Sequence, residues 1–136
     1  MAEVEYMHVC DYAFPGQSGK PCVIGIFDRI RALGFPVTHG HMHLAVQFRG
    51  QQNEIVPIKI ELCRPNGEVL VKIEGRVSIS PQGGSFTDFI LSNIQFPEPG
   101  TYTVKVLSAG RPLATQSLYL QQVEHDPQPP SGMPVH

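Results

Sequence analysis

The 136-residue sequence contains no tryptophan, three cysteines and few charged residues, which make up 16% of the chain. Ten Lys and Arg face twelve Asp and Glu, so no basic stripe exists to neutralise phosphates, and we expect no nucleic-acid partner. No apolar run approaches the roughly 18 residues of a membrane span. Because residues 1–5 also lack the pattern of a secretory signal, we expect a cytoplasmic protein that does not enter a membrane.

Motifs for catalysis are lacking as well. The sequence has no G-x-S-x-G, no phosphate-binding loop before a helix and no evident pair of carboxylates. Cys10, Cys22 and Cys63 are odd in number and lack C-x-x-C spacing, so we expect reduced, buried thiols and no disulfide. We therefore expect neither an enzyme nor a cofactor.

Turn-forming residues, by contrast, are abundant: glycine and proline occur 13 times each, which favours many short strands over long helices. The length fits one domain with a sizeable core. We predict a single β-sandwich over residues 1–123. Residues 124–136 are rich in proline and too poor in apolar groups to offset the entropy of ordering, so we expect a flexible tail.

Alternation of apolar and polar residues locates the strands. It is clearest in residues 41–49, where one face carries Met42, Leu44, Val46 and Phe48 and the other carries His41, His43, Gln47 and Arg49. We interpret the first face as core and the second as solvent-exposed. Residues 3–12 are apolar on both faces and predict a strand with two neighbours, and the β-branched run 22–27 predicts a buried strand in which Gly25 marks a close approach.

Later segments continue the pattern with two exceptions. Residues 54–63 and 69–80 read as the arms of a hairpin around Asn66-Gly67, with Pro57 at an edge or at a strand's beginning. Residues 28–33 have weak helical spacing that Gly34 and Pro36 interrupt, so we expect the end of a strand and an irregular crossing. The apolar spacing of residues 86–96 fits a strand or a helix, and this alternative stays open.

Three alternate histidines form the most suggestive chemical motif. His39, His41 and His43 would share one face of a strand, about 6 to 7 Å apart in steps, and could converge on zinc. However, side chains on a straight strand point in parallel, and no evident carboxylate or fourth ligand accompanies them. Solvent-facing histidines are the competing interpretation.

A second polar group surrounds the end of the run 22–27. Asp28 keeps the parity of Ile26 and Ile30, so it would point toward the core if the strand continued, and a buried carboxylate needs a partner. Asp28 could cap a loop or pair with a neighbouring arginine. Alternatively, Asp28, Arg29 and Phe35 could form a recognition spot.

The pattern Glu98-x-Gly100-x-Tyr102-x-Val104 resembles the tyrosine corner of immunoglobulin-like domains. In that motif a buried phenol returns its hydroxyl group to nearby backbone. Val104 stands where antibody domains have cysteine, which favours a fibronectin-like or generic sandwich. We assign Glu98, Gly100 and Tyr102 a structural role.

The order of features from Val4 to Leu120 also resembles a family of small uncharacterised bacterial proteins with a domain of unknown function. The resemblance is carried by Val4-Glu5-Tyr6, Asp11-Tyr12, Ile24-Gly25-Ile26-Phe27-Asp28-Arg29-Ile30, Phe35-Pro36 and Pro99-Gly100-Thr101-Tyr102. It implies a β-sandwich in a cytoplasmic setting and no established activity.

The sequence therefore predicts an all-β protein, an immunoglobulin-like antiparallel β-sandwich of seven to nine strands. Open sandwiches have edge strands that can pair with other chains, so we expect a non-catalytic binding or protein-interaction module whose partner is a second copy or another protein. The alternative is a metal or small-ligand site in the histidine cluster at 39–43.

Overall fold

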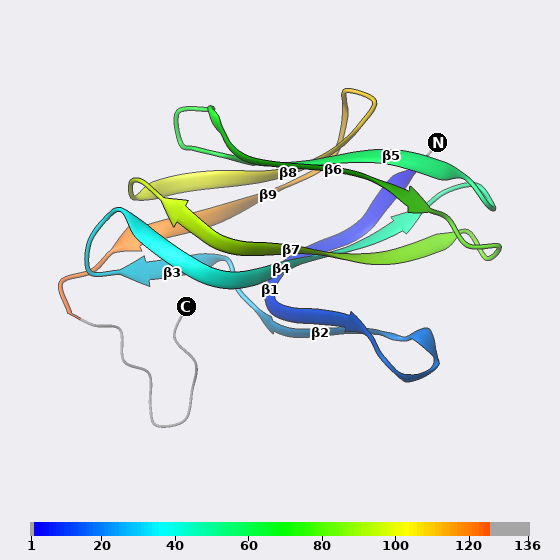
Figure 1. The fold of residues 1–136 in the computed structure, drawn as a ribbon, viewed down its shortest axis with the longest axis horizontal. Helices are drawn as coiled ribbons and strands as arrows, with labels where there is room; N and C mark the ends of the chain where they lie inside the picture. The colour runs from blue at the N-terminus through cyan, green and yellow to red at the C-terminus, as the bar shows by residue number, and fades with distance from the viewer. Residues whose placement is uncertain (1, 126–136) are drawn as a thin grey trace.

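The computed structural model describes residues 2–125, which form nine β-strands and one short 3-10 turn (Figure 1). The strands are β1 (Glu3–Pro15), β2 (Pro21–Ile26), β3 (Arg29–Ala32), β4 (Val37–Arg49), β5 (Ile55–Cys63), β6 (Val69–Ser78), β7 (Gly84–Phe96), β8 (Gly100–Ser108) and β9 (Arg111–Gln122). The 3-10 turn, Gln17–Gly19, joins β1 to β2. Of the predicted tail, residues 126–136 lie outside the described residues.

The strands form two sheets. The four-stranded sheet has the order β2-β1-β4-β7, and the five-stranded sheet has the order β3-β9-β8-β5-β6. Neighbouring strands are antiparallel except β3 and β9, which run parallel. The predicted antiparallel sandwich of seven to nine strands is thus confirmed, with one parallel pair at the edge of a sheet.

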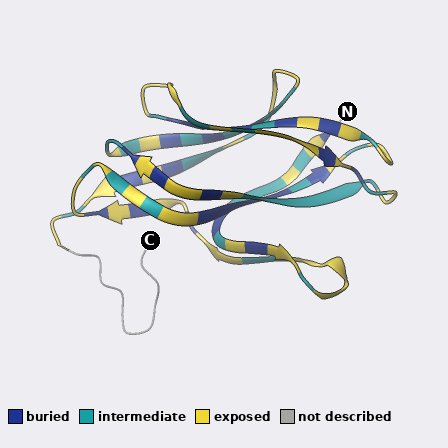
Figure 2. Cartoon of the chain, viewed as in Figure 1, coloured by how far each residue is buried: buried dark blue, intermediate teal, exposed yellow. Residues whose placement is uncertain are grey.

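One continuous core lies between the sheets, and buried and exposed bands alternate along the strands that enclose it (Figure 2). Its largest fully buried side chains are Tyr102, Phe48, Phe96, Met42, Leu44, Ile60, Leu62, Ile79, Leu118, Val9, Val46 and Val106. All four apolar residues that the alternation of 41–49 assigned to the core are therefore buried. Because successive strand residues point to opposite faces, β4 also projects side chains on the outside of its sheet.

The ambiguous segment 86–96 lies in strand β7, which pairs with β4 from Arg49 opposite Gly84 to Val37 opposite Phe96. Its helix-like spacing has a local cause. Asn93 has a φ of 53°, in the left-handed region, and the alternation of buried residues changes phase there. Leu91 and Ile94 are consequently both buried, although they are three residues apart.

Strand β2 is an edge strand, and the prediction of a buried strand over residues 22–27 is wrong. Figure 1 shows the β1–β2 hairpin on the side of the molecule away from β5, β6 and β8, and β2 is the edge of its sheet. Ile24 and Ile26 are therefore 52% and 57% exposed, and only Phe27, just past the strand, is buried. The close approach at Gly25 is confirmed, because a Cβ there would collide with the carboxylate of Asp11.

Residues 28–33 include strand β3, which the sequence did not predict. The backbone crosses to the five-stranded sheet after Phe27, whose N–H donates to the carbonyl of Val9.

The predictions for the hairpin turn and for Pro57 agree with the structure. Asn66-Gly67 closes the β5–β6 hairpin with a φ of 94° at Gly67, and Pro57 lies near the beginning of β5, before the pairing with β8 starts.

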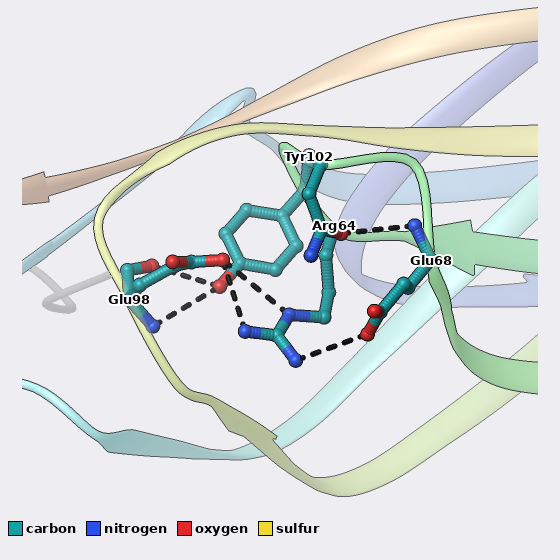
Figure 3. A network of polar contacts seen from close by, with 5 residues as sticks. Arg64, Glu68, Glu98 and Tyr102 are labelled. Atoms are coloured by element: carbon teal, nitrogen blue, oxygen red, sulfur yellow. Dashed lines mark hydrogen bonds and ion pairs between the residues drawn. The ribbon is translucent and has the colours of Figure 1, made fainter.

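The tyrosine corner is present (Figure 3). The buried phenol of Tyr102 donates to the backbone carbonyl of Glu98 at 2.8 Å and accepts from the Glu98 N–H at 3.3 Å. Its ring meets Phe96 edge-on, with centroids 5.1 Å apart. Arg64 extends the network, because its Nη2 lies 3.2 Å from the Glu98 carboxylate. Gly100, with a φ of 139°, leaves room for the ring of Pro65.

Candidate functional site on the outer face of the four-stranded sheet

Cross-strand pairing defines the outer face of the four-stranded sheet. One row crosses all four strands, because Cys10 lies opposite both Ile26 and His43, and His43 lies opposite Ile90. Directly paired residues share a face of the sheet. We call this surface the histidine face and define it by Cys10, Tyr12, Ile24, Ile26, His41, His43, Asp88 and Ile90.

His43 is the buried centre of this face. Its Nδ1 lies 3.0 Å from Oδ2 of Asp88, and its Nε2 lies 2.8 Å from Nε2 of His41. The ring of Tyr12 covers both imidazoles at centroid distances of 5.5 and 5.7 Å. His43 is only 6% exposed, so the interpretation of this side of β4 as solvent-exposed is wrong for His43 and correct for His41. The reason is that the side chains of Tyr12 from β1 and Asp88 from β7 lie against the ring of His43.

The Asp88 carboxylate fixes the proton positions along this chain. An ionised carboxylate only accepts hydrogen bonds, so His43 carries a proton on Nδ1. When both rings are neutral, Nε2 of His43 accepts and Nε2 of His41 donates. The remaining nitrogen of His41, Nδ1, then carries a lone pair at the exposed end of the chain.

Cys10 lies beside this chain as a protonated thiol. Its Sγ is 3.7 Å from the backbone carbonyl of His43, and the residue is fully buried. Burial raises the pKa of the Cys10 thiol to about 11, and the negative charges of Asp11 and Asp88 add to the effect. A thiol with so high a pKa is a poor nucleophile at neutral pH.

His39 does not join the other two histidines. The change of phase between the two halves of β4 and β7 turns it toward the core, where its ring lies 5.8 Å from Phe27 and its strand partner is Ile94. Among residues 2–125, no group of three or more His, Cys, Asp or Glu side chains is arranged to hold a metal ion. The structure therefore does not assemble His39, His41 and His43 into the predicted cluster.

A hollow opens where the chain of imidazoles reaches the surface. Its volume is about 410 Å³, and Asp11, Tyr12, Ile24 and His41 line it. Tyr12 and Ile24 lie opposite each other on β1 and β2 and are 57% and 52% exposed. With Ile26 and Ile90, they give the face an aliphatic and aromatic rim around the buried imidazole.

The outer face of the five-stranded sheet has a different composition. Lysine and glutamate alternate there across neighbouring strands: Lys59 lies opposite Glu74, and Glu61 lies opposite Lys72 and Lys105. Such ladders of compensated charge are typical of a sheet that faces water. The histidine face lacks a ladder of this kind among the described residues, so the two outer faces of one sandwich differ in chemistry.

The predicted recognition spot lies elsewhere in the fold. Asp28 was predicted to point toward the core only if the strand continued; β2 ends at Ile26, and Asp28 is exposed. Its backbone carbonyl accepts from the N–H of Tyr119 at 2.7 Å. Arg29 lies over the ring of Tyr119, whereas Phe35 packs against the main core. Phe35 therefore contributes to the core, whereas Asp28 and Arg29 lie on the surface.

Several residues of the histidine face were not predicted from the sequence. Asp88 and Ile90 belong to the segment that fitted both a strand and a helix, so no face could be assigned to them. Ile24 and Ile26 were placed in a buried strand. The alternation of Phe86, Asp88, Ile90 and Ser92 was the signal that could have located the β7 part of the face.

No helix of residues 2–125 has the length and apolarity that crossing a membrane requires.

Solved structures share this fold at low sequence identity. The C-terminal domain of wzt is 10% identical with a TM-score of 0.55, and the match covers 90% of this chain and 74% of that one. A β-glucosidase from Listeria innocua in complex with glucose is 10% identical with a TM-score of 0.52. The match covers 89% of this chain and 16% of the β-glucosidase chain. An immunoglobulin-like protein from Pseudomonas aeruginosa is 14% identical with a TM-score of 0.49. The match covers 89% of this chain and 97% of that protein. The first two likenesses concern the fold alone.

Among curated proteins, none matches the sequence. A family model does: residues 5–121 match a family described as a family of unknown function, DUF6941. The matched range contains the histidine face and the tyrosine corner, and the predicted resemblance to a family of unknown function is confirmed. The chain belongs to the family of unknown function DUF6941.

Proposed function

We propose that the protein is a non-catalytic protein-interaction module that self-associates through the histidine face. The observation that carries the proposal is the exposure of Ile24, Ile26 and Ile90 on a sheet whose counterpart is covered by paired charges. Exposed apolar patches on a protein surface often mark interaction sites. Because each of these side chains is already about half buried, covering the rest contributes about half of the 1.5–3 kcal/mol of full burial, about 0.8–1.5 kcal/mol.

A second copy is an occupant of suitable size and charge. Three to four strands about 4.8 Å apart and about 20 Å of strand from Tyr6 to Tyr12 give a patch of about 300–400 Å² per copy. Two copies would bury about 600–800 Å² together, which is below the standard size of a stable interface and corresponds to a weak, transient one. The patch carries imidazoles as well as a carboxylate. Contact between two copies therefore does not place groups of only one charge sign against each other.

The chemistry of the site supports a binding role over a catalytic one. The chain from Asp88 through His43 ends at His41, and no hydroxyl or thiol of the described residues donates a hydrogen bond to it. A nucleophile in reach of the base is the minimum for acyl-transfer chemistry. The free thiols at Cys10, Cys22 and Cys63 suit a cytoplasmic setting, which we include in the proposal.

Sedimentation equilibrium between about 10 μM and about 1 mM tests self-association. We expect a monomer–dimer equilibrium whose dissociation constant rises at least about tenfold in Ile26→Lys and in Ile90→Lys. Ile55→Lys is the matched control, because Ile55 is an equally exposed isoleucine on the other sheet. A strict monomer over the whole range, or an equal effect of Ile55→Lys, contradicts the proposal.

A further inference from the structure

Strand β3 is an edge of the five-stranded sheet, and its backbone groups divide into two sets. The Tyr119 N–H donates to the carbonyl of Asp28 at 2.7 Å, and the Val123 N–H donates to the carbonyl of Ala32 at 2.9 Å. Backbone groups of successive strand residues point in alternate directions. The even-numbered residues of β3 therefore face β9, whereas Arg29 and Arg31 direct their N–H and C=O groups to the open edge.

The side chains of the same two residues point to solvent. Ile30 and Ala32 are buried in the core, and Arg29 and Arg31 are exposed. Alternate residues of one strand lie about 6.6–6.8 Å apart on one face. The edge strand thus presents two arginine side chains on one face, beside two backbone units that point to the open edge.

These arginines lack compensating carboxylates. Among the described residues, neither Arg29 nor Arg31 forms an ion pair. The opposite edge strand, β6, carries Lys72 and Glu74, whose charged atoms lie 3.7 Å apart. Charges on an edge protect it from unwanted pairing. On β6, Lys72 and Glu74 compensate each other, whereas on β3 both arginines remain available to a partner.

Arg29 is also held in place. Its guanidinium lies 5.5 Å from the centroid of the Tyr119 ring, within the range of a cation–π contact. Beside it is a hollow of about 360 Å³, lined by Thr101, Tyr119, Gln121 and neighbouring residues. A stacked guanidinium loses less freedom on binding than a free one, and its planar donors match a carboxylate in two-point contact.

We propose that β3 accepts an extended acidic segment of a partner protein as an added strand, with carboxylates at positions i and i+2 opposite Arg29 and Arg31. The outward backbone groups supply the main-chain hydrogen bonds, and the arginines select the acidic sequence. A second copy of β3 does not fit, because it would set arginine against arginine. This site is independent of the histidine face and lies on the other sheet.

Nuclear magnetic resonance with a capped peptide, acetyl-Thr-Val-Glu-Val-Glu-Val-Thr-amide, tests the proposal. Without peptide, we expect the amide hydrogens of Arg29 and Arg31 to exchange rapidly and that of Ile30 to exchange slowly, because it faces β9. With saturating peptide, we expect Arg29 and Arg31 to become protected. Binding without that protection overturns strand addition, and absence of binding overturns the whole proposal.

Substitutions separate the side-chain and backbone contributions. We expect Arg29→Gln and Arg31→Gln each to weaken the peptide by about tenfold, while Arg76→Gln on the edge strand β6 leaves it unchanged. Arg31→Pro removes an edge donor without removing a bond to β9, so it should weaken binding more than Arg31→Gln. An equal loss in Arg76→Gln, equal binding of the same peptide with lysine for glutamate, or equal binding of a single-stranded oligonucleotide contradicts an acidic-strand site.

Discussion

Nδ1 of His43 lies 3.0 Å from Oδ2 of Asp88, although the two residues are 45 positions apart in the sequence. The contact joins β4 to β7 on the outer face of the four-stranded sheet, and only the pairing of these strands brings it about. It buries an imidazole under an apolar rim. The stability of the sheet and the chemistry of its outer face therefore depend on the same pair.

Asp88→Asn should lower the free energy of unfolding by about 1–2 kcal/mol, because a hydrogen bond to a charged acceptor becomes a neutral one. The imidazole nitrogen resonances of His43 should shift, because the charged acceptor that favours its Nδ1–H form becomes a neutral amide oxygen. Urea unfolding and a nitrogen-detected histidine spectrum measure the two effects. Asp28→Asn, at an exposed position, is the control. Unchanged spectra in Asp88→Asn would sink this assignment.

Cys10 gives a prediction about alkaline pH. The pKa of its thiol rises from 9.0 to about 11 in the folded protein, mainly through burial. Between about pH 9 and about pH 11, the Cys10 thiol therefore stays protonated in the folded chain and is deprotonated in the unfolded chain. The stability contributed by the neutral thiol is complete below about pH 9 and is lost as the pH rises toward about 11.

The comparison with Cys10→Ala isolates this effect from those of other groups that titrate in the same range. The gap in unfolding free energy between the wild type and Cys10→Ala should narrow as the pH rises from about 8 to about 10.5. Urea midpoints at both pH values measure it. A gap that stays constant argues against a protonated thiol in this cluster.

Tyr102→Phe removes the hydroxyl that bridges the backbone of Glu98 and should cost about 1 kcal/mol or somewhat more. The ring and its contact with Phe96 remain, so the loss reports the hydrogen bonds. Tyr119→Phe is the matched control, because that tyrosine is partly exposed and its ring still faces Arg29. Equal urea midpoints for the wild type and Tyr102→Phe would count against the corner.

Gly100→Ala tests the other half of the corner. The φ of 139° is strained for any residue with a side chain, and a Cβ would lie 2.8 Å from Cγ of Pro65. We expect a loss of about 1–3 kcal/mol in thermal or urea unfolding. Gly34→Ala is the control, because a Cβ there meets nothing within 4 Å. Similar stabilities for the two variants would refute the steric explanation.

The sequence predicted the parts of the fold that local pattern determines. Met42 and Leu44 alternate with polar residues, Asn66-Gly67 has the chemistry of a tight turn, and the spacing of Glu98, Gly100 and Tyr102 identified the corner. Each of these signals lies within a few residues of the chain. The burial that they imply follows from the period of a strand.

The histidine face could not be predicted in the same way, because it depends on which strands are neighbours. Asp88 can contact His43 only when β7 lies beside β4, and Ile26 is exposed only because β2 is an edge strand. His39 was grouped with His41 on the assumption of regular alternation. The change of phase near Asn93, a tertiary feature of two paired strands, separates them.

Methyl resonances of the isoleucines test the central claim, self-association through the histidine face, most directly. In a dilution series of the full chain, we expect the methyl groups of Ile24, Ile26 and Ile90 to shift with concentration, while that of Ile55 stays constant. Shifts that are absent over the whole range, or that are as large at Ile55, would contradict the proposed interface.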